Sequence, residues 1–331
     1  MLKKMLKMRE LIAVVFIVVL FLGVGALNPA FLSTSNNMLC LNSSVVYTII
    51  AVGISMVIMT GEIDVSVGAV MGISAAITGA MIRDGAPWIL AIGCALLAGA
   101  LVGLVNGIGV NIIGVPSIIM TLGVNSIVRG MIYVYSGGAW IENLPFDFKS
   151  TSQLKVGAIT WFYLGVLILT VLIHLFLTKT RPGRYVKAVG DNAGGATLLG
   201  IPVRGTKIAT FVACAVCAAI GGVMYAARVG FITPTAGAGY DMKVIASCVL
   251  GGISLTGGVG SVIGAALGAI IMSSISRMLV FVGLSSDYDD TITGLLLITI
   301  VVADALMHRH AMEKARRERL SAKTASVAKE V

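Results

Sequence analysis

The chain has 331 residues, of which 57% are hydrophobic and only 12% are charged, and its formal net charge is +9. Soluble domains carry about a quarter charged residues, so this composition excludes an ordinary soluble protein and indicates an all-α polytopic membrane protein. The positive charge does not indicate nucleic-acid binding, because Lys and Arg gather at helix ends and in one tail without interleaved aromatic residues. The 40 glycines suit helices that pack closely in lipid.

Ten segments approach the length of about 20 mostly apolar residues that a membrane-spanning helix needs. They are residues 11–27, 44–60, 65–82, 87–112, 116–135, 159–178, 208–229, 242–255, 259–282 and 291–307. The first segment follows a basic N-terminus, as in a signal peptide, but its apolar run is long and no small-x-small cleavage site follows, so we expect a retained helix. Segment 242–255 is the weakest, and a re-entrant segment there would make the number of crossings odd.

The positive charges indicate the orientation of the chain. Of the 24 Lys and Arg residues, four precede the first segment, six lie in residues 178–207 and seven follow Asp304. Since cytoplasmic loops are enriched in Lys and Arg, we expect both termini and residues 178–207 on the cytoplasmic side of a bacterial inner membrane. The expected layout is a cytoplasmic N-terminus at 1–10, one transmembrane domain at 11–307 and a basic cytoplasmic tail at 308–331. That tail could also be attracted to anionic membrane lipid.

Residues 178–207 form the long polar interruption in the second half of the chain. Asp191 or Asn192 can cap a helix over residues 193–199, Gly200 suits its C-terminal turn, and Pro202 blocks its continuation. A helix of about two turns is too short to cross a membrane. It is therefore either an ordinary connector or a docking element for a cytosolic partner.

Polar residues in and near apolar segments are the candidates for a translocation path or gate. Glu62, Asp64 and Ser66 lie in the glycine-bounded turn GEIDVSVG at 61–68, where they could face a path, pair with a basic group or be solvated. Asn106 and Asn125 are amides that suit an uncharged hydroxyl-bearing ligand or join helices. The turn GISLTGG at 252–258 resembles residues 61–68, which suggests an internal repeat.

Other patterns argue against catalysis. The sequence has no G-x-x-x-x-G-K-S/T run, so a P-loop for ATP is not expected, and the three histidines lack catalytic or metal-ligand company. The C-x-x-C spacing of Cys214 and Cys217 lies within an apolar segment and indicates packing. We expect no enzyme activity, cofactor or metal.

The predicted outer loop at 136–157 contains Trp140 and Glu142. Its aromatic and polar mixture suits contact with a soluble partner, although a solvated loop would look similar. The other predicted outer segments are 28–42, 83–86, 230–241 and 283–290.

Three motifs carry a family resemblance over nearly the whole chain. The turn at 61–68, the stretch GDNAGGATLLGI at 190–201 and the segment VLGGISLTGG at 249–258 resemble the permeases of bacterial sugar ABC importers of the ribose, xylose, arabinose and rhamnose type. Residues 137–145, with Phe231 to Pro234 and residues 237–243, are most similar to permeases of autoinducer-2 importers.

The resemblance implies a permease that imports a sugar or sugar-like solute, paired with a second permease, identical or related. A cytosolic ABC ATPase would hold the short helix, and a periplasmic solute-binding protein would deliver the ligand, with Trp140 and Glu142 as its docking residues. By position, the coupling surface would consist of Asp191, Asn192, Ala196, Leu199, Gly200 and Ile201. Gly194 and Gly195 should weaken this helix by about 1 kcal/mol each relative to alanine.

A self-sufficient secondary transporter is the alternative function. Such transporters usually place several ionisable groups in the membrane interior, and here these groups are few and near helix ends. An intramembrane enzyme would need paired His, Asp or Glu residues within helices, which the sequence does not offer.

Overall fold

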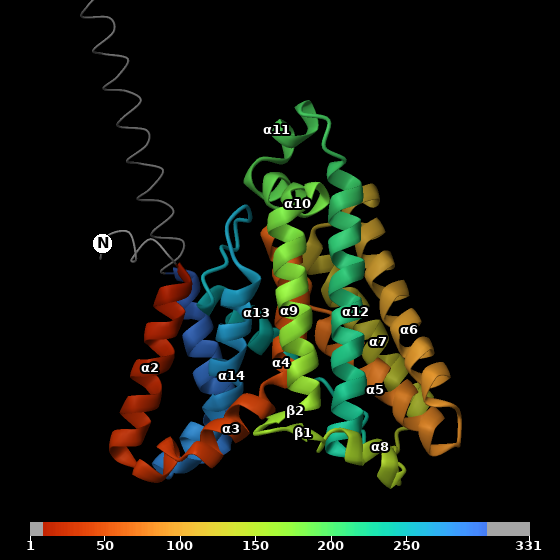
Figure 1. Cartoon of the computed structure of the whole chain (residues 1–331). Helices are drawn as coiled ribbons and strands as arrows, with labels where there is room; N and C mark the ends of the chain where they lie inside the picture. The colour runs from red at the N-terminus through yellow and green to blue at the C-terminus, as the bar shows by residue number, and fades with distance from the viewer. Residues whose placement is uncertain (1–8, 303–331) are drawn as a thin grey trace, which may run out of the picture.

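The computed structural model describes residues 9–302, and most of this part of the chain is helical (Figure 1). The longer helices are α2 (Arg9–Leu27), α4 (Val45–Met59), α5 (Val67–Arg83), α6 (Trp88–Ile108), α7 (Ser117–Ser136), α9 (Trp161–Lys179), α12 (Val203–Val229) and α14 (Val262–Val282). The shorter ones are η1 (Pro29–Leu32), α3 (Thr34–Ser43), the π-helical η2 (Gly109–Ile113), α8 (Phe146–Thr151), α10 (Arg181–Asp191), α11 (Ala193–Leu198), α13 (Tyr240–Leu250) and η3 (Ser286–Tyr288). Residues 289–302 are also helical. The predicted N-terminus, the end of the tenth segment and the basic tail lie partly or wholly outside the described residues.

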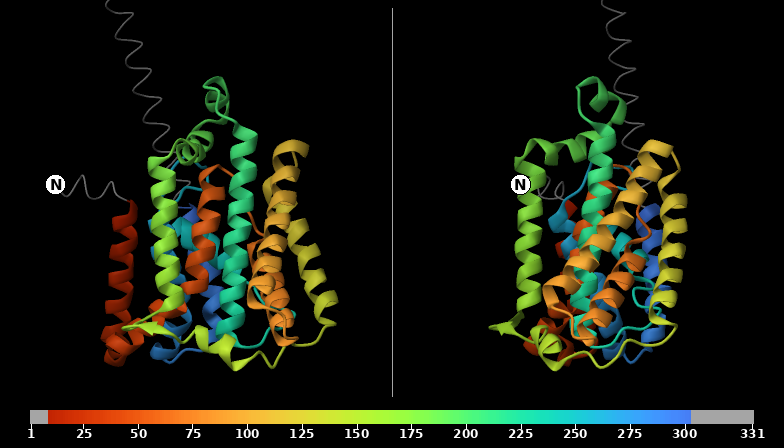
Figure 2. Two further views of the ribbon diagram at one scale, coloured as in Figure 1. Left: turned by 45° about the vertical axis from the view of Figure 1, so that its right-hand side comes forward. Right: turned by 90° about the vertical axis from the view of Figure 1, so that its right-hand side faces the viewer.

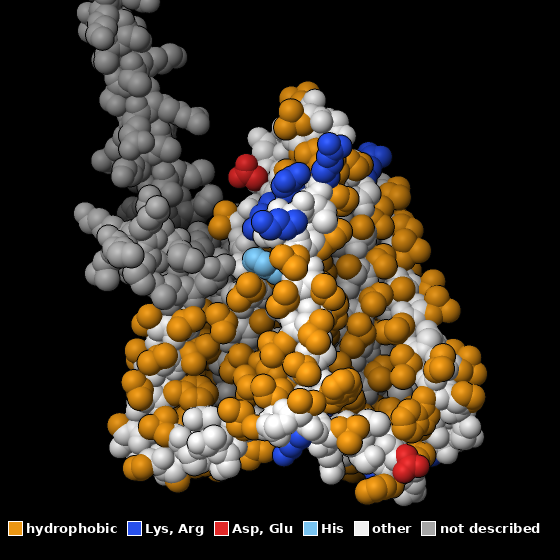
Figure 3. Space-filling view, in the orientation of Figure 1, with side chains coloured by type: hydrophobic (Ala, Val, Ile, Leu, Met, Phe, Trp, Pro, Cys, Tyr) orange, Lys and Arg blue, Asp and Glu red, His pale blue; other side chains and the backbone are white. Residues whose placement is uncertain are grey.

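The long helices run roughly side by side between two ends of the molecule (Figures 1 and 2). One end, which we call the α11 end, carries α10 and α11. The other, the hairpin end, carries α8 and the antiparallel strands β1 (Lys155–Val156) and β2 (Ile159–Thr160). Hydrophobic side chains cover much of the visible surface between the two ends (Figure 3). This distribution fits a bundle surrounded by lipid.

The membrane-spanning character follows from helix length and composition. Within residues 9–302, five helices are individually long and apolar enough to cross a membrane: α6 with η2, α7, α9, α12 and α14. A sixth span results if α3 and α4, which meet at a 45° bend, are counted together, and α5 is a shorter apolar helix. The prediction of an all-α polytopic membrane protein is confirmed. Length and composition support five or six spans in this part of the chain, fewer than the ten predicted segments.

Helix α12 is the centre of the bundle and packs against α4, α5 and α6. Small residues permit this close approach: a Cβ added at Gly99 or Gly103 of α6 would lie 2.7 Å from the Cβ of Ala219 or Ala215 of α12. Such backbone proximity maximises van der Waals contact, which holds helices together where lipid removes the hydrophobic drive.

The predicted crossing at 242–255 is wrong as a spanning helix. Helix α13 has 11 residues and is about 16 Å long at 1.5 Å per residue, against a hydrocarbon core of about 30 Å. Gly251 caps it, and Gly252 adopts a φ of +86°, a conformation that ends helices and favours glycine. The glycines that give this segment its motif therefore also shorten its helix.

The sequence predicts an outer turn at 230–241, and part of residues 231–239 packs against the bundle. Pro234, Ala236 and Gly237 are buried, and the Gly237 carbonyl accepts a hydrogen bond of 3.1 Å from Nη2 of Arg129. Gly68 of α5 provides the room, because a Cβ there would lie 2.5 Å from the Gly237 oxygen. A non-helical segment thus leads into α13, and Arg129 of α7 holds it by its backbone.

Replacing Gly72 of α5 with Ala should destabilise the protein by about 1–3 kcal/mol, the usual cost of overpacking. The added methyl group would collide with the Ala236 carbonyl. Gly93→Ala on α6 is the control, because nothing lies within 4 Å of the added atom. Thermal unfolding in mild detergent should show a lower midpoint for the first variant alone. Equal midpoints would contradict the packing of residues 231–239 on α5.

Candidate functional site

A helix that the sequence did not predict, α10, begins the polar stretch at the α11 end. The Thr180 hydroxyl accepts a hydrogen bond of 3.1 Å from the Gly183 N–H, and Pro182 stands in the first turn. Val186 and Val189, three residues apart, are buried on one face. The capping residue, the early proline and this spacing were the signals for an amphipathic helix.

Helix α11 follows as predicted. Of the two candidate caps, Asn192 acts: its Oδ1 accepts a hydrogen bond of 2.8 Å from the Gly195 N–H. The helix ends at Leu198, one residue before the predicted end, and Gly200 takes a φ of +76°. The Ile201 N–H donates to the Ala196 carbonyl at 3.0 Å, which closes the C-terminal turn.

Helix α11 lies at the far tip of the molecule (Figure 1), where hydrophobic side chains are visible on the surface (Figure 3). Leu198 is 90% exposed and Leu199 is 80% exposed. Of the predicted coupling residues, four are exposed, Ile201 is half-buried and Ala196 is buried. The exposed four are Asp191, Asn192, Leu199 and Gly200. Ala196 therefore lies on the buried side of α11 and is not available to a partner. Leu198, which was not predicted, belongs to the exposed side.

The C-terminal end of α10, at Gly190, contacts two glycine-rich turns, one after α4 and one after α13. We call this contact the glycine junction; its members are Gly61, Gly190, Gly257 and Gly258. The Gly258 N–H donates to the Met59 carbonyl at 3.0 Å, and a Cβ at Gly190 would collide with the Met59 carbonyl and lie 2.5 Å from the Gly258 nitrogen. A Cβ at Gly257 would lie 2.8 Å from the Gly61 nitrogen. The two turns that looked alike in sequence therefore meet each other and the support of α11.

An ion pair reinforces this region. Nζ of Lys207, at the start of α12, lies 2.6 Å from Oε1 of Glu62, and each side chain is 17% exposed. Of the three interpretations of Glu62, the structure shows pairing with a basic group. The pair ties the turn after α4 to the first turns of α12.

Asp64 and Ser66 lie deeper in the bundle, in a buried polar cluster with Asn106 of α6. Asp64 Oδ1 accepts hydrogen bonds from the backbone N–H and the hydroxyl of Ser66, at 2.8 and 2.6 Å, and Asn106 Nδ2 donates to the Ser66 hydroxyl at 2.8 Å. All three residues are 0% exposed. Ser66 precedes α5 at the N-cap position, but its hydroxyl serves Asp64 and not the helix.

Two oxygens of this cluster, Asp64 Oδ2 and Asn106 Oδ1, are buried and have no hydrogen-bond partner among residues 9–302. A buried unpaired acceptor costs about 1–3 kcal/mol. Both oxygens could therefore accept a hydrogen bond from a donor that enters the bundle.

Two hydroxyl residues of α7 that the sequence did not single out hold the backbone before α5. Ser117 Oγ accepts from the Ile63 N–H at 3.3 Å, and Thr121 Oγ1 accepts from the Val65 N–H at 3.1 Å. Non-helical backbone inside a membrane protein needs such partners. Asn125, one turn further along α7, is half-buried, and no hydrogen bond joins it to the Asp64 cluster in the described part of the chain.

The predicted docking residues lie at the hairpin end. Trp140 is 58% exposed and stacks on Phe231, with ring centroids 5.5 Å apart and planes 11° apart. The neighbouring Ile141 and Ile232 exchange backbone hydrogen bonds of 2.9 Å, and Glu142 is exposed. An exposed aromatic pair and a carboxylate are thus held together on a backbone bridge.

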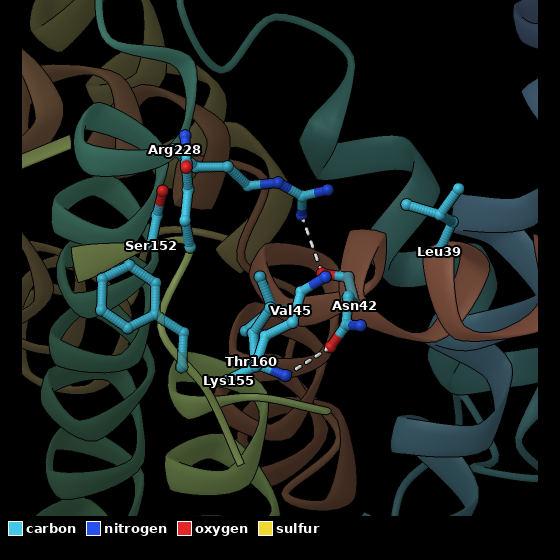
Figure 4. A pocket seen from close by; sticks show the side chains of 9 residues that line it. Leu39, Asn42, Val45, Ser152, Lys155, Thr160 and Arg228 are labelled. Atoms are coloured by element: carbon cyan, nitrogen blue, oxygen red, sulfur yellow. Dashed lines mark hydrogen bonds between the residues drawn. The ribbon is translucent and has the colours of Figure 1, made fainter. Parts of the chain in front are cut away.

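A cavity of about 460 Å³ lies nearby at the hairpin end (Figure 4). Arg228 points across it and donates to the Asn42 and Ser43 carbonyls at 2.9 and 3.0 Å and to the Ser43 hydroxyl at 3.0 Å. Asn42 Oδ1 accepts from the Thr160 N–H at 2.8 Å. These bonds fix the bend between α3 and α4, so Arg228 has a structural role.

The arrangement offers exposed surfaces and buried polar contacts, and no metal site is found in the part of the chain that the structure describes. Within residues 9–302, no cluster of three His, Cys, Asp or Glu residues could hold a metal ion. Cys214 and Cys217 are buried in α12, and a Cβ added at Gly53 of α4 would lie 2.7 Å from the Cys217 Cβ. Spanning helices, a buried polar cluster and an exposed short helix are the features of an integral membrane protein with a surface for a partner.

Comparison with known proteins gives the family. Residues 37–301 match the family described as branched-chain amino acid transport system / permease component. The chain belongs to this family and is a permease subunit of an ABC importer. No solved structure matches it significantly.

Its relatives include proteins named autoinducer 2 import system permease protein LsrC. The protein of Salmonella typhi is 38% identical over 322 residues, which cover 96% of this chain and 92% of the relative. The Enterobacter sp. (strain 638) protein is 38% identical over 93% of this chain and 90% of its own length. The Escherichia coli (strain K12 / DH10B) protein is 37% identical over 95% and 92%. The predicted resemblance is confirmed.

Replacing Gly190 with Ala should disrupt the glycine junction, because the new methyl group collides with the Met59 carbonyl. We expect a loss of stability of about 1–3 kcal/mol, or, if α10 moves away, a loss of uptake. Gly194→Ala is the matched control: its Cβ would meet only Asn192 Oδ1, at 3.4 Å, and should favour α11. Thermal unfolding and vesicle uptake measure both effects. A Gly190→Ala protein that behaves like the control would refute the junction.

Ser66→Ala should destabilise the bundle by about 1–3 kcal/mol, because it removes the hydroxyl that bonds both Asp64 and Asn106. Ser126→Ala is the control, since the Ser126 hydroxyl bonds only the Leu122 carbonyl of its own helix. Unfolding in detergent should separate the two variants. Equal stability would mean that the cluster contributes nothing to the fold.

Proposed function

We propose that this permease imports a small sugar-like solute, autoinducer-2 in particular, into the bacterial cytoplasm. The names of relatives at 37–38% identity support the solute. The chain would act as one of two permease subunits, identical or related, and would carry out no covalent chemistry itself.

The observation that carries the proposal is the exposed leucine tip of α11. Leu198 and Leu199 are among the most exposed large apolar side chains, and they project from a polar end where they gain nothing from lipid. Apolar side chains at such a position suit burial in a partner. The partner would be a cytosolic ABC ATPase that hydrolyses ATP and moves α11.

Charge supports a cytoplasmic position for the α11 end. Exposed or half-exposed Lys and Arg side chains gather over α9, α10 and the start of α12 (Figure 3), as the positive-inside rule requires. The hairpin end would then face the periplasm. There Trp140, Phe231 and Glu142 would meet a solute-binding protein that delivers the ligand.

The glycine junction gives a physical route from the ATPase to the interior. Movement of α11 and α10 would displace the turns at Gly61 and Gly258 directly, because their backbones are in contact. The first turn leads straight to Asp64 and Ser66. Asp64, Ser66 and Asn106 would therefore gate the path, and Glu62 would hold the gate through Lys207; Asn125 would line the path separately.

Leu199→Asp should leave membrane insertion intact but uncouple ATP hydrolysis from uptake, because a charge replaces an apolar contact. We expect ATPase binding to weaken by about 2 kcal/mol or more, the cost of losing a central interface residue. Leu154→Asp is the control, since Leu154 is 58% exposed and lies close to the hairpin. Normal uptake by the Leu199→Asp protein would contradict the proposal that the ATPase binds α11 through Leu199.

Purification from native membranes in mild detergent, with mass spectrometry of bound proteins, tests the whole assembly. Recovery of an ATPase, with one kind of permease or two, would support the proposal and give the stoichiometry. Isolation of the chain alone, with solute movement that needs no ATP, would instead support a secondary transporter. Membership of the ABC permease family argues against that alternative.

A further inference from the structure

An apolar cavity of about 430 Å³ lies beneath α10 at the α11 end. Its walls come from α4, α9, α10 and α12 and include Met56, Phe176, Tyr185 and Ala209. Ala209 is exposed, so the cavity opens to the outside. The adjoining surface of α9 carries Phe176 and other exposed apolar side chains, as expected for a face in lipid.

Both threonine hydroxyls in its walls already donate to backbone carbonyls, which leaves the Tyr185 hydroxyl as the other polar side-chain group of the lining. Thr206 Oγ1 donates to the Pro202 carbonyl at 2.9 Å, and Thr210 Oγ1 donates to the Lys207 carbonyl at 2.7 Å. A sugar would find few hydrogen-bond partners here, and its desolvation would be uncompensated. The cavity suits a hydrocarbon chain.

Three arginines lie next in the chain to wall residues of this cavity, at the end of the molecule where Lys and Arg side chains gather (Figure 3). Arg181 and Arg184 each precede a wall residue of α10, and Arg204 precedes the wall residue Gly205 of α12. All three are exposed, and none forms an ion pair with another described residue. Guanidinium groups bind phosphate through paired hydrogen bonds, and basic pockets between membrane helices bind anionic lipid head groups.

We propose that this cavity is a binding site for an anionic phospholipid. One acyl chain fills the space between α9 and α12, and the phosphate lies against the three arginines. A helix of a second copy of this chain would fill the apolar space but leave the guanidinium groups without anions, so lipid fits the charge better. Because Tyr185 and Pro182 belong to α10, the bound lipid holds α10 against the bundle.

Native mass spectrometry of the purified full chain tests the site, with phosphatidylglycerol or phosphatidylcholine added to a lipid-free sample. We expect phosphatidylglycerol to be retained, and Arg181→Gln with Arg184→Gln to weaken its binding by at least about tenfold, because the charge-assisted hydrogen bonds to the phosphate are lost. Arg83→Gln is the control, because Arg83 lies at the far end of α5 and pairs with Asp84. Ala209→Phe should block the acyl chain while leaving every arginine in place.

Three results would overturn the proposal. The first is equal retention of phosphatidylcholine, which would remove the role of charge. The second is unchanged phosphatidylglycerol binding in both the double variant and Ala209→Phe. The third is efficient disulfide cross-linking of Ala209→Cys between two copies, which would show that a second permease occupies the cavity. Gel filtration of each variant confirms that it is folded before binding is measured.

Discussion

Backbone contact at the glycine junction is the constraint on which the functional architecture depends. Gly190, Gly257 and Gly258 bring three chain segments so close that a single methyl group would force them apart. One segment carries α11, one follows α4 toward the Asp64 cluster, and one follows α13. Since close-packed backbones leave little room for independent movement, the proposed mechanism would use this contact to couple the exposed helix to the polar interior.

The polar interior contains both well-satisfied groups and oxygens without a hydrogen-bond donor among the described residues. Ser117 and Thr121 satisfy the backbone before α5, and Lys207 neutralises Glu62, so this non-helical stretch is held on two sides. Asp64 and Asn106 nevertheless keep unpaired oxygens in a buried position. Buried polar groups in membrane proteins are costly and mark functional positions. The proposed gate would use both properties: the present arrangement is stable, and the unpaired oxygens could accept a hydrogen bond from another partner.

Much of this fold could be read from the sequence. Long apolar runs predicted the helices, and Asn192 with Gly200 marked α11 almost to the residue. Local patterns could not reveal contacts between remote positions. The Glu62 and Lys207 side chains pair across 145 positions. Residues 236–237 pack on α5 because Gly68 and Gly72 have no side chains there. Helix α10 was missed because its cations dominate the composition, while its buried face consists of few residues. The roles of the predicted coupling, path and docking residues stay predictions.

The most direct test is a pair of distances in the reconstituted importer, measured by pulsed electron paramagnetic resonance with and without ATP. Spin labels at Lys187 of α10 and Thr256 of the second turn report on the junction, and labels at Thr256 and Asp84 report on the two ends of the bundle; half-buried Cys94 is first replaced by Ser. We predict that the Lys187–Thr256 distance stays constant while the Thr256–Asp84 distance changes. Independent movement of Lys187 and Thr256 would contradict a junction that moves as one unit.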